Sequence, residues 1–373
     1  MIRTAGLRIA YTFLRSFYAI LPAVVIWGTL FWTPVVTFVI AFASLHLATR
    51  VEEIDALNRW CRRLRIACES GPRPRVDVHP LIFLGLSFVN YTCAFWIYLH
   101  FEALHLGGIG SRVLFVLGAG LMLGWTAGVN LGVVFHNHLH RGTFRSARLN
   151  RWIGRLWTLP SGWPSFFWQY KHTAVHHQRV GRADDWVQPK TNAAGEYESI
   201  HRYVLCHWPW RYARHLWREF AGSRRLRRRA LLELAMFLPF WAIPLAIDPI
   251  AGIGLWLYPH WFGSAFILGT GMYTQHAGGT AGKKHSGSTT FLSEFFNITM
   301  FNVGYHTEHH ANPSVHWTEL PQLHETLREE LIAGGAHIVA YGSYHASHLL
   351  SRRGAAARSE FFQQHPAYVE GGA

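Results

Sequence analysis

Three short segments of the chain concentrate histidine, the side chain that most often binds metal ions in proteins. The chain has 25 histidines among 373 residues. Because residues three or four apart share one face of a helix, a cluster with such spacing can direct two or three imidazoles toward one point. Eight imidazoles exceed the ligands of one ion, so the pattern predicts two metal ions without identifying the metal. The clusters read HxxxH, HxxxHH and HxxHH, and their members are His136 and His140; His172, His176 and His177; and His306, His309 and His310.

A ninth histidine, His138, lies in the middle of the first cluster. It is two residues from His136 and from His140, so a helix would turn its side chain away from both. We therefore predict that His138 is not a ligand. The four cysteines form no CxxC pair, which argues against a zinc ribbon or an iron–sulfur cluster.

Three carboxylates beside the clusters are candidates for orienting the ligands. A metal-bound histidine usually donates its other ring N–H to a carboxylate or a carbonyl. Asp184 and Asp185 follow the second cluster, and Glu308 lies inside the third. The alternatives stay open: the two aspartates could cap a helix, and Glu308 could simply be solvated.

The elements that must hold these clusters are apolar. Hydrophobic residues make up 50% of the chain and charged residues only 15%, compared with roughly 25% charged in ordinary soluble domains. This composition excludes intrinsic disorder and indicates an all-α integral membrane protein. Apolar segments lie near residues 17–48, 81–101, 113–135, 234–247 and 250–274.

The number of membrane spans depends on the first of these segments. A single span needs about 20 apolar residues, so residues 17–48 form either one long tilted helix or a hairpin of two short helices bent near Pro34. We expect the hairpin. The last two segments are separated by the turn-like pair Asp248-Pro249. The sequence thus predicts four to six transmembrane helices.

Arginine clusters predict the orientation, because short loops rich in basic residues stay in the cytoplasm. The net charge is +14, and basic clusters precede the first apolar segment (Arg3, Arg8 and Arg15), occupy the loop 50–79 and precede the fourth segment (224–229). We expect one domain over residues 1–373, with a cytoplasmic cap from 136–229 and 275–330 that holds the dimetal site, and a C-terminal tail at 331–373. The clusters adjoin apolar segments and match no zinc-finger or helix-turn-helix signature, so membrane lipids are the expected contact and nucleic acid is not.

In this order, with two apolar segments between the second and third, the clusters resemble the histidine boxes of the membrane fatty acid desaturase family and its hydroxylase, acetylenase and ketolase relatives. The third cluster, from Asn302 through His310 to His316-Trp317, is similar to the bacterial acyl-lipid and sphingolipid desaturase branches. The resemblance covers roughly Val113 to Leu323. It implies that the eight clustered histidines bind two iron ions.

Some members of that family add a ninth ligand within an Asn-x-x-x-His arrangement at the cytoplasmic end of the span before the third box. His276 takes this place, and the resemblance implies that it is a ligand. The alternative is a helix-end histidine that bonds a carbonyl. Met272 stands where the asparagine is expected, which departs from the acyl-CoA branch of the family.

The resemblance also implies an activity. A diiron centre would use O2 to remove two hydrogens from a fatty acyl lipid, in the bacterial inner membrane with the site on the cytoplasmic side. Hydroxylase, acetylenase or ketolase activity is the alternative.

The chain shows no HPGG haem motif, CxxC pair or GxGxxG fingerprint, so an external electron donor is expected: a ferredoxin, or a small haem protein with its reductase. A membrane metal transporter is the competing class, but transporters place their ligands near the membrane midplane, whereas these clusters lie at or beyond the ends of the apolar segments.

Overall fold

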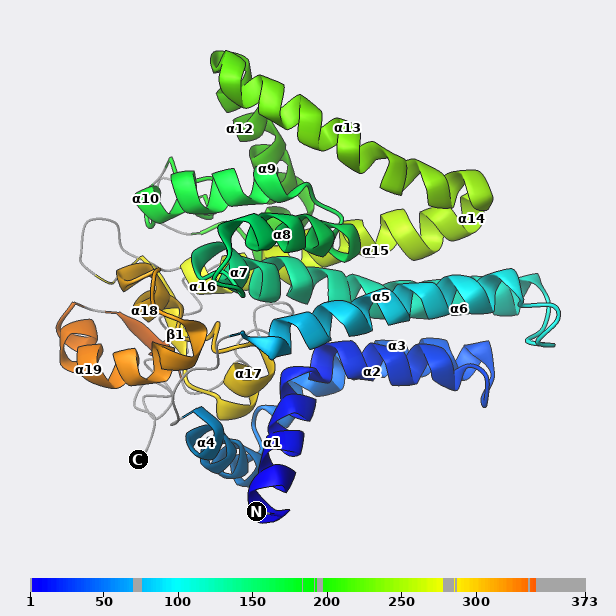
Figure 1. The fold of residues 1–373 in the computed structure, drawn as a ribbon, viewed down its shortest axis with the longest axis horizontal. Coiled ribbons are helices and arrows are strands. Elements are labelled where there is room, and N and C mark those ends of the chain that lie inside the picture. Colours follow the sequence, from blue (N-terminus) through cyan, green and yellow to red (C-terminus); the bar gives the residue numbers. More distant parts are fainter. Residues whose placement is uncertain are drawn as a thin grey trace.

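The computed structural model of the protein is mostly helical in the residues that it describes (Figure 1). The all-α prediction is confirmed for this part of the chain, apart from one small sheet. The expected tail beyond residue 339 lies outside the described residues. The structure describes residues 2–69, 76–182, 184–190, 192, 197–277, 285, 287–334 and 336–339.

The first apolar segment forms a hairpin of two short helices, as predicted. The second helix begins at Pro34, because the fixed φ of proline suits the first turn of a helix, and Thr33 caps it by accepting from the Val36 N–H at 3.4 Å. The preceding helix α1 meets the hairpin at a bend of 73°. Arg15 was grouped with the cytoplasmic arginines, but it is fully buried at the end of α1. The elements are α1 (Ile2–Arg15), α2 (Phe17–Gly28), α3 (Pro34–Val51) and α4 (Asp55–Glu69).

The second and third apolar segments form another hairpin, whose second helix runs without a break into the first histidine box. Asp77 starts the hairpin by accepting from the His79 N–H at 3.2 Å. The hairpin extends to the right in Figure 1, and the box lies at its other end. Its elements are α5 (Val78–Leu99), α6 (Ile109–Val129), the π-helical η1 (Asn130–Phe135) and α7 (His136–His140).

The middle of the chain consists of shorter helices around the second box, which lies on a π-helical stretch. These elements are α8 (Ala147–Ser161), α9 (Ser165–Gln169), the π-helical η2 (Tyr170–His176), α10 (His177–Arg179), α11 (Ile200–Arg202), the π-helical η3 (Tyr203–His207) and α12 (Trp208–Gly222).

A third hairpin follows, with its turn at Asp248 as the sequence indicates. The Asp248 side chain accepts from the Ala251 N–H at 2.9 Å and so begins the returning helix. This returning run is helical throughout and ends at His276. The elements are α13 (Arg224–Ile247), α14 (Pro249–Gly252), η4 (Ile253–Leu257), α15 (Tyr258–Phe262), η5 (Gly263–Leu268) and α16 (Gly269–His276), with η4 and η5 π-helical.

Three glycines let α6 approach the run that ends at His276. Gly120, Gly124 and Gly128 recur every four residues, so they share one helix face. A Cβ at these positions would lie 2.7, 2.6 and 2.5 Å from side-chain atoms of the facing run. Close approach at small residues is a common way for apolar helices to pack. This close packing holds the helix that carries the first box against the helical run that ends at His276.

The last described part carries the third box and closes over the same end of the hairpins. Two short parallel strands pair in it, with Thr289 opposite His337. The elements are β1 (Thr289–Phe291), α17 (Glu294–Thr299), α18 (His306–Ala311), the 3-10 helix η6 (Trp317–Glu319), α19 (Leu320–Ala333) and β2 (His337–Val339).

Three of the described helices are long and apolar enough to cross a membrane, or four if α1 and α2 count as one bent span. These three cover Val78–Leu99, Ile109–His140 and Arg224–Ile247. The helix Pro34–Ala48 is apolar but shorter. By length and apolarity, the described helices thus include at most four candidate spans, the lower end of the predicted range of four to six transmembrane helices.

Candidate metal centre

The structure brings all nine candidate histidines together at one end of the hairpins, where α7, α16 and α18 lie in Figure 1. They form two groups, and within each group the candidate ligand atoms lie within 4.8 Å of one another. The first and third boxes and His276 supply ligands from short helices or helix ends. In the second box, η2 supplies His172 and His176, and α10 begins with His177. The five-histidine group consists of His136, His140, His172, His177 and His309, and the four-histidine group consists of His176, His276, His306 and His310.

The boxes do not map one to one onto these groups. The first box contributes both of its histidines to the five-histidine group. The second box gives His172 and His177 to that group but His176 to the other. The third box is divided as well, with His309 in the five-histidine group. Each box still directs two imidazoles at one group, as expected, but only the first box keeps all of its histidines in a single group.

The spacing of the ring nitrogens fits a metal with bonds near right angles. In the five-histidine group, Nε2 of His172 lies 2.9 Å from Nε2 of His140 and 3.0 Å from Nε2 of His177. In the other group, Nε2 of His306 lies 3.0 Å from Nε2 of both His276 and His310. Metal–nitrogen bonds of about 2.1 Å separate neighbouring ligands by roughly 3.0 Å at right angles and by about 3.4 Å in a tetrahedron. The residues present therefore fit a pair of metal ions, and five- or six-coordinate ions better than tetrahedral zinc.

Three ligands have their rings oriented by an acceptor on the far side. Nδ1 of His176 donates to the Asp185 carboxylate at 2.8 Å, and Nδ1 of His276 donates to the Gly287 carbonyl at 3.2 Å. Nδ1 of His136 donates to Oδ1 of Asn137 at 3.1 Å. Each bond places the ring proton on Nδ1, which leaves Nε2 unprotonated for a metal.

Burial favours the neutral form of four of the clustered imidazoles. The desolvation of His172 and His309, followed by the repulsion of neighbouring imidazoles, holds the pKa of both side chains well below the usual range. The same causes lower the pKa of His306 and His310. Since a metal binds the neutral form of histidine, these rings are ready to act as ligands near neutral pH.

Comparison with known proteins agrees with this arrangement. A sequence model of the fatty acid desaturase family matches residues 111–342. The chain belongs to the fatty acid desaturase family. It is also 25% identical over 236 residues to a beta-carotene ketolase of Paracoccus sp. (strain N81106 / MBIC 01143), an alignment that covers 61% of this chain and 87% of the ketolase.

The family match confirms the resemblance seen in the histidine boxes. All nine histidines of this desaturase-family protein lie within residues 111–342. Helices α1 to α5 lie before the matched region. The histidine centre thus belongs to the part shared with the family, and the N-terminal helices lie outside it.

His138 stands apart from both groups. Its Nε2–H donates to the Asn150 carbonyl at 2.9 Å, and its Nδ1 accepts from the Thr143 hydroxyl at 2.9 Å. Because both ring nitrogens are occupied by protein groups, no lone pair is left for a metal. The geometry agrees with the prediction that His138 is not a ligand.

The three carboxylates have three different roles. Asp185 is fully buried and bonds His176, and its second oxygen also accepts from the Val187 N–H at 3.2 Å. Asp184 instead lies at the surface and pairs with Arg182 at 3.2 Å. Of the two neighbours, Asp185 alone bonds a box histidine among the described contacts.

Glu308 points away from the metal groups, although it sits inside the third box. It is fully buried, so the solvated alternative is wrong. Its carboxylate accepts from the Thr290 hydroxyl at 2.7 Å and from Nδ1 of His324. These bonds tie α18 to β1 and α19, so Glu308 holds the helix of the third box rather than a ligand ring.

Asn137 is a site residue that the sequence reasoning missed. It orients His136, and its Nδ2 donates to the Phe301 carbonyl at 3.3 Å. The signal available in the sequence was its position beside a box histidine, inside the HNHLH segment. Its partner is 164 residues away, so the local pattern could not reveal the second bond.

Proposed function

We propose that the nine histidines bind two iron ions and that the protein uses O2 to oxidise an unreactive C–H bond of an apolar substrate. The observation that carries this proposal is the pair of imidazole groups with nitrogen spacings of 2.9 to 3.2 Å at the end of apolar helices. Imidazole suits iron as a ligand. Membership of the desaturase family supports iron in place of other metals that imidazole binds.

The residues of this chain have defined tasks in the proposed reaction. The nine imidazoles would hold the irons, which when bound supply the activation of O2. Asp185 and Asn137 keep the rings of His176 and His136 in position and fix their protons on Nδ1. Six of the nine ligands are buried and three are partly buried, which restricts the access of bulk water to the centre and so limits side reactions.

The apolar exterior of the hairpins supports insertion into a membrane. Large apolar side chains are exposed along them, for example Phe31, Phe42 and Ile243. Exposed apolar surface of this extent is unusual for a soluble protein. With the arginines at 224–229 on the cytoplasmic side, we propose a location in the bacterial inner membrane with the centre facing the cytoplasm.

For the substrate, we propose a fatty acyl lipid that is desaturated, with electrons from an external ferredoxin or haem protein. The segment from Asn302 to Trp317 supports this choice through its similarity to acyl-lipid desaturases. The match to a beta-carotene ketolase supports a second candidate, in which a methylene of a larger apolar molecule is oxidised to a ketone. Both reactions begin with the removal of hydrogen from a C–H bond of an apolar molecule.

A metal transporter remains the competing class, and the position of the ligands argues against it. The described ligands gather at the ends of helices and on the segments beyond them. Transport would require ligands along the spans. Iron that stays bound through purification and dialysis would support the enzyme, and iron that exchanges freely would support the transporter.

The test of the reaction is mass spectrometry of products formed under labelled oxygen. Cells that express the protein, with or without added beta-carotene, are compared with cells that express His309→Ala. An acyl product that lacks two hydrogens and carries no label supports desaturation. A labelled ketone formed from the carotene supports the ketolase candidate and overturns the acyl assignment. Identical products from both proteins would overturn the oxidase proposal.

A further inference from the structure

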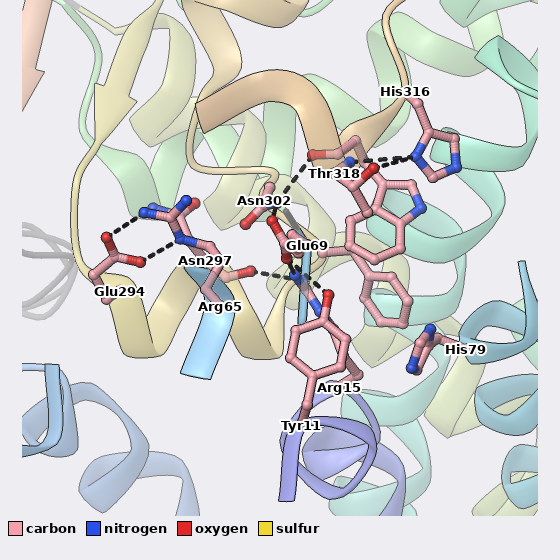
Figure 2. A network of polar contacts seen from close by, with 12 residues as sticks. Tyr11, Arg15, Arg65, Glu69, His79, Glu294, Asn297, Asn302, His316 and Thr318 are labelled. Carbon is pink, nitrogen blue, oxygen red and sulfur yellow. Dashed lines mark hydrogen bonds and ion pairs between the residues drawn. The ribbon is translucent and has the colours of Figure 1, made fainter. Parts of the chain in front are cut away.

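A buried arginine at the end of α1 connects the N-terminal helices to the loop before the third box (Figure 2). Arg15 is fully buried and forms an ion pair with Glu69, which ends α4. Its Nη1 donates to the Asn297 carbonyl at 3.1 Å. The guanidinium also lies 4.3 Å from the ring centre of Trp317. A buried charge needs partners of this kind to offset its desolvation.

Glu69 extends this contact to a second position in the same loop. Its carboxylate accepts from the Tyr11 hydroxyl at 2.7 Å and from Nδ2 of Asn302 at 3.4 Å. Nδ2 of Asn302 also donates to the Trp317 carbonyl at 2.9 Å. The ion pair therefore contacts the loop before its sharpest turn, at Asn297, and within that turn, at Asn302.

That turn is conformationally costly. Phe301 and Asn302 both have positive φ, +51° and +58°. Two successive residues other than glycine in this region persist only when their surroundings hold them. Oδ1 of Asn297 accepts from the Gly304 N–H at 3.0 Å and closes the loop. The loop then leads directly into His306, the first ligand of the third box.

The same loop touches the other metal group. The Phe301 carbonyl accepts from Nδ2 of Asn137 at 3.3 Å, and Asn137 orients His136. His136 belongs to the five-histidine group, while His306 belongs to the four-histidine group. A shift of the loop would therefore move ligands of both groups.

We propose that Arg15 is a positioning residue for the dimetal centre, acting with Glu69 to hold residues 297–305 in the conformation that places His306 and orients His136. Helices α1 and α4, which lie outside the family-matched residues 111–342, thereby complete the centre. The inference rests on the proposed metal site. The alternative is that the Arg15–Glu69 ion pair only stabilises the fold and does not affect metal binding.

The experiment removes both charges together. A single change at Arg15 would leave Glu69 buried and unpaired, which is strongly destabilising, whereas replacing both partners by neutral residues is often tolerated. The double variant Arg15→Met/Glu69→Gln is purified, stripped of metal and titrated with cobalt(II). Visible absorption reports both the affinity and the geometry of the bound cobalt. We expect a melting temperature close to that of the unaltered protein, roughly tenfold weaker cobalt binding and altered absorption bands.

The control is an ion pair with an exposed glutamate at the opposite end of the second hairpin. Arg112 pairs with Glu102 at 3.1 Å and also lies over an aromatic ring, 5.4 Å from the centre of Tyr98. Arg112→Met/Glu102→Gln should leave the cobalt affinity and spectrum unchanged. An equal loss in this control would overturn the inference, because the effect would then be general.

If the double variant does not fold, a second variant tests the positioning role of Arg15 and Glu69. Asn302→Gly keeps both charges paired and suits the positive φ, but it removes the bonds from Nδ2. We expect it too to weaken and alter cobalt binding. Unchanged binding in a folded variant overturns the inference while the proposed function stands. Failure of the unaltered protein to bind cobalt overturns the proposed metal site, and the inference with it.

Discussion

The first and second histidine boxes look alike in sequence but distribute their histidines differently. His136 and His140 lie four residues apart on the α-helix α7 and join the same group. His172 and His176 also lie four apart, yet they join different groups, and His172 shares its group with His177. His172 and His176 lie on π-helical η2, and His177 begins α10. The His177 N–H donates to the His172 carbonyl, five residues back, so this π-helical turn brings His172 and His177 onto one face. The π-helical turn therefore accounts for the pairing of His172 with His177 in one group.

The division of the second box has a structural consequence. His176 and His177 are neighbours in the chain but belong to different groups, so one peptide unit ties the two groups together. The α-helical α18 does the same with His309 and His310. A change in either helix is therefore expected to alter the distance between the two groups as well as the histidines within them.

The largest expected effect separates two ligands of the second box. His172→Ala and His176→Ala should each abolish turnover, because each removes a ligand while the folded helices remain. With iron-57, the Mössbauer spectrum should show that His172→Ala disturbs the iron of the five-histidine group and His176→Ala that of the other. His100→Ala is the control. His100 is exposed and lies outside the histidine boxes, so this change should leave both iron signals intact. If both second-box variants disturbed the same signal, the assignment from the π-helix would be wrong.

His276 provides the next test, because it lies outside the three boxes. His276→Ala should remove the iron of the four-histidine group and leave the five-histidine iron in place, so about half of the iron should be lost, together with turnover. Elemental analysis of the purified protein measures the ratio of iron to chain. Retention of both irons with full turnover would show that His276 serves only to bond the Gly287 carbonyl.

A smaller effect is expected from the carboxylate that orients His176. Asp185→Asn should lower iron affinity or activity roughly 10- to 100-fold, since the ring then loses a charged acceptor. Asp184→Asn is the matched control: its side chain is exposed and pairs with arginines, so the change should have little effect. Competition with a chelator gives both affinities. Equal losses in the two variants would contradict the orienting role of Asp185.

Much of the frame could be predicted because its signals are local. Pro34 marks the start of α3, and Asp248 marks the turn between α13 and α14. The histidine spacings identified eight of the nine members of the two groups, and the family resemblance added the ninth, His276.

The remaining features depend on contacts that no local pattern contains. Arg15 reads as a membrane-flanking arginine, but its partner Asn297 is 282 residues away. Asn137 likewise acquires its role from distant Phe301. The π-helical course of η2 is not marked by the histidine spacing, which predicts the pairing of residues four apart on an α-helix. Local spacing therefore identified the ligands but neither their division nor the distant contacts that support them.

The smallest expected effect concerns His138, which shares the first box with two ligands. His138→Ala should keep both irons and most turnover, because its ring nitrogens bond Asn150 and Thr143 rather than a metal. Loss of two buried hydrogen bonds should lower the free energy of unfolding by about 2 kcal/mol. Thermal melting measures this change, and elemental analysis measures the iron. Loss of one iron in His138→Ala would mean that the first box holds three ligands, and the contrast between α7 and η2 would then need a different explanation from helix type.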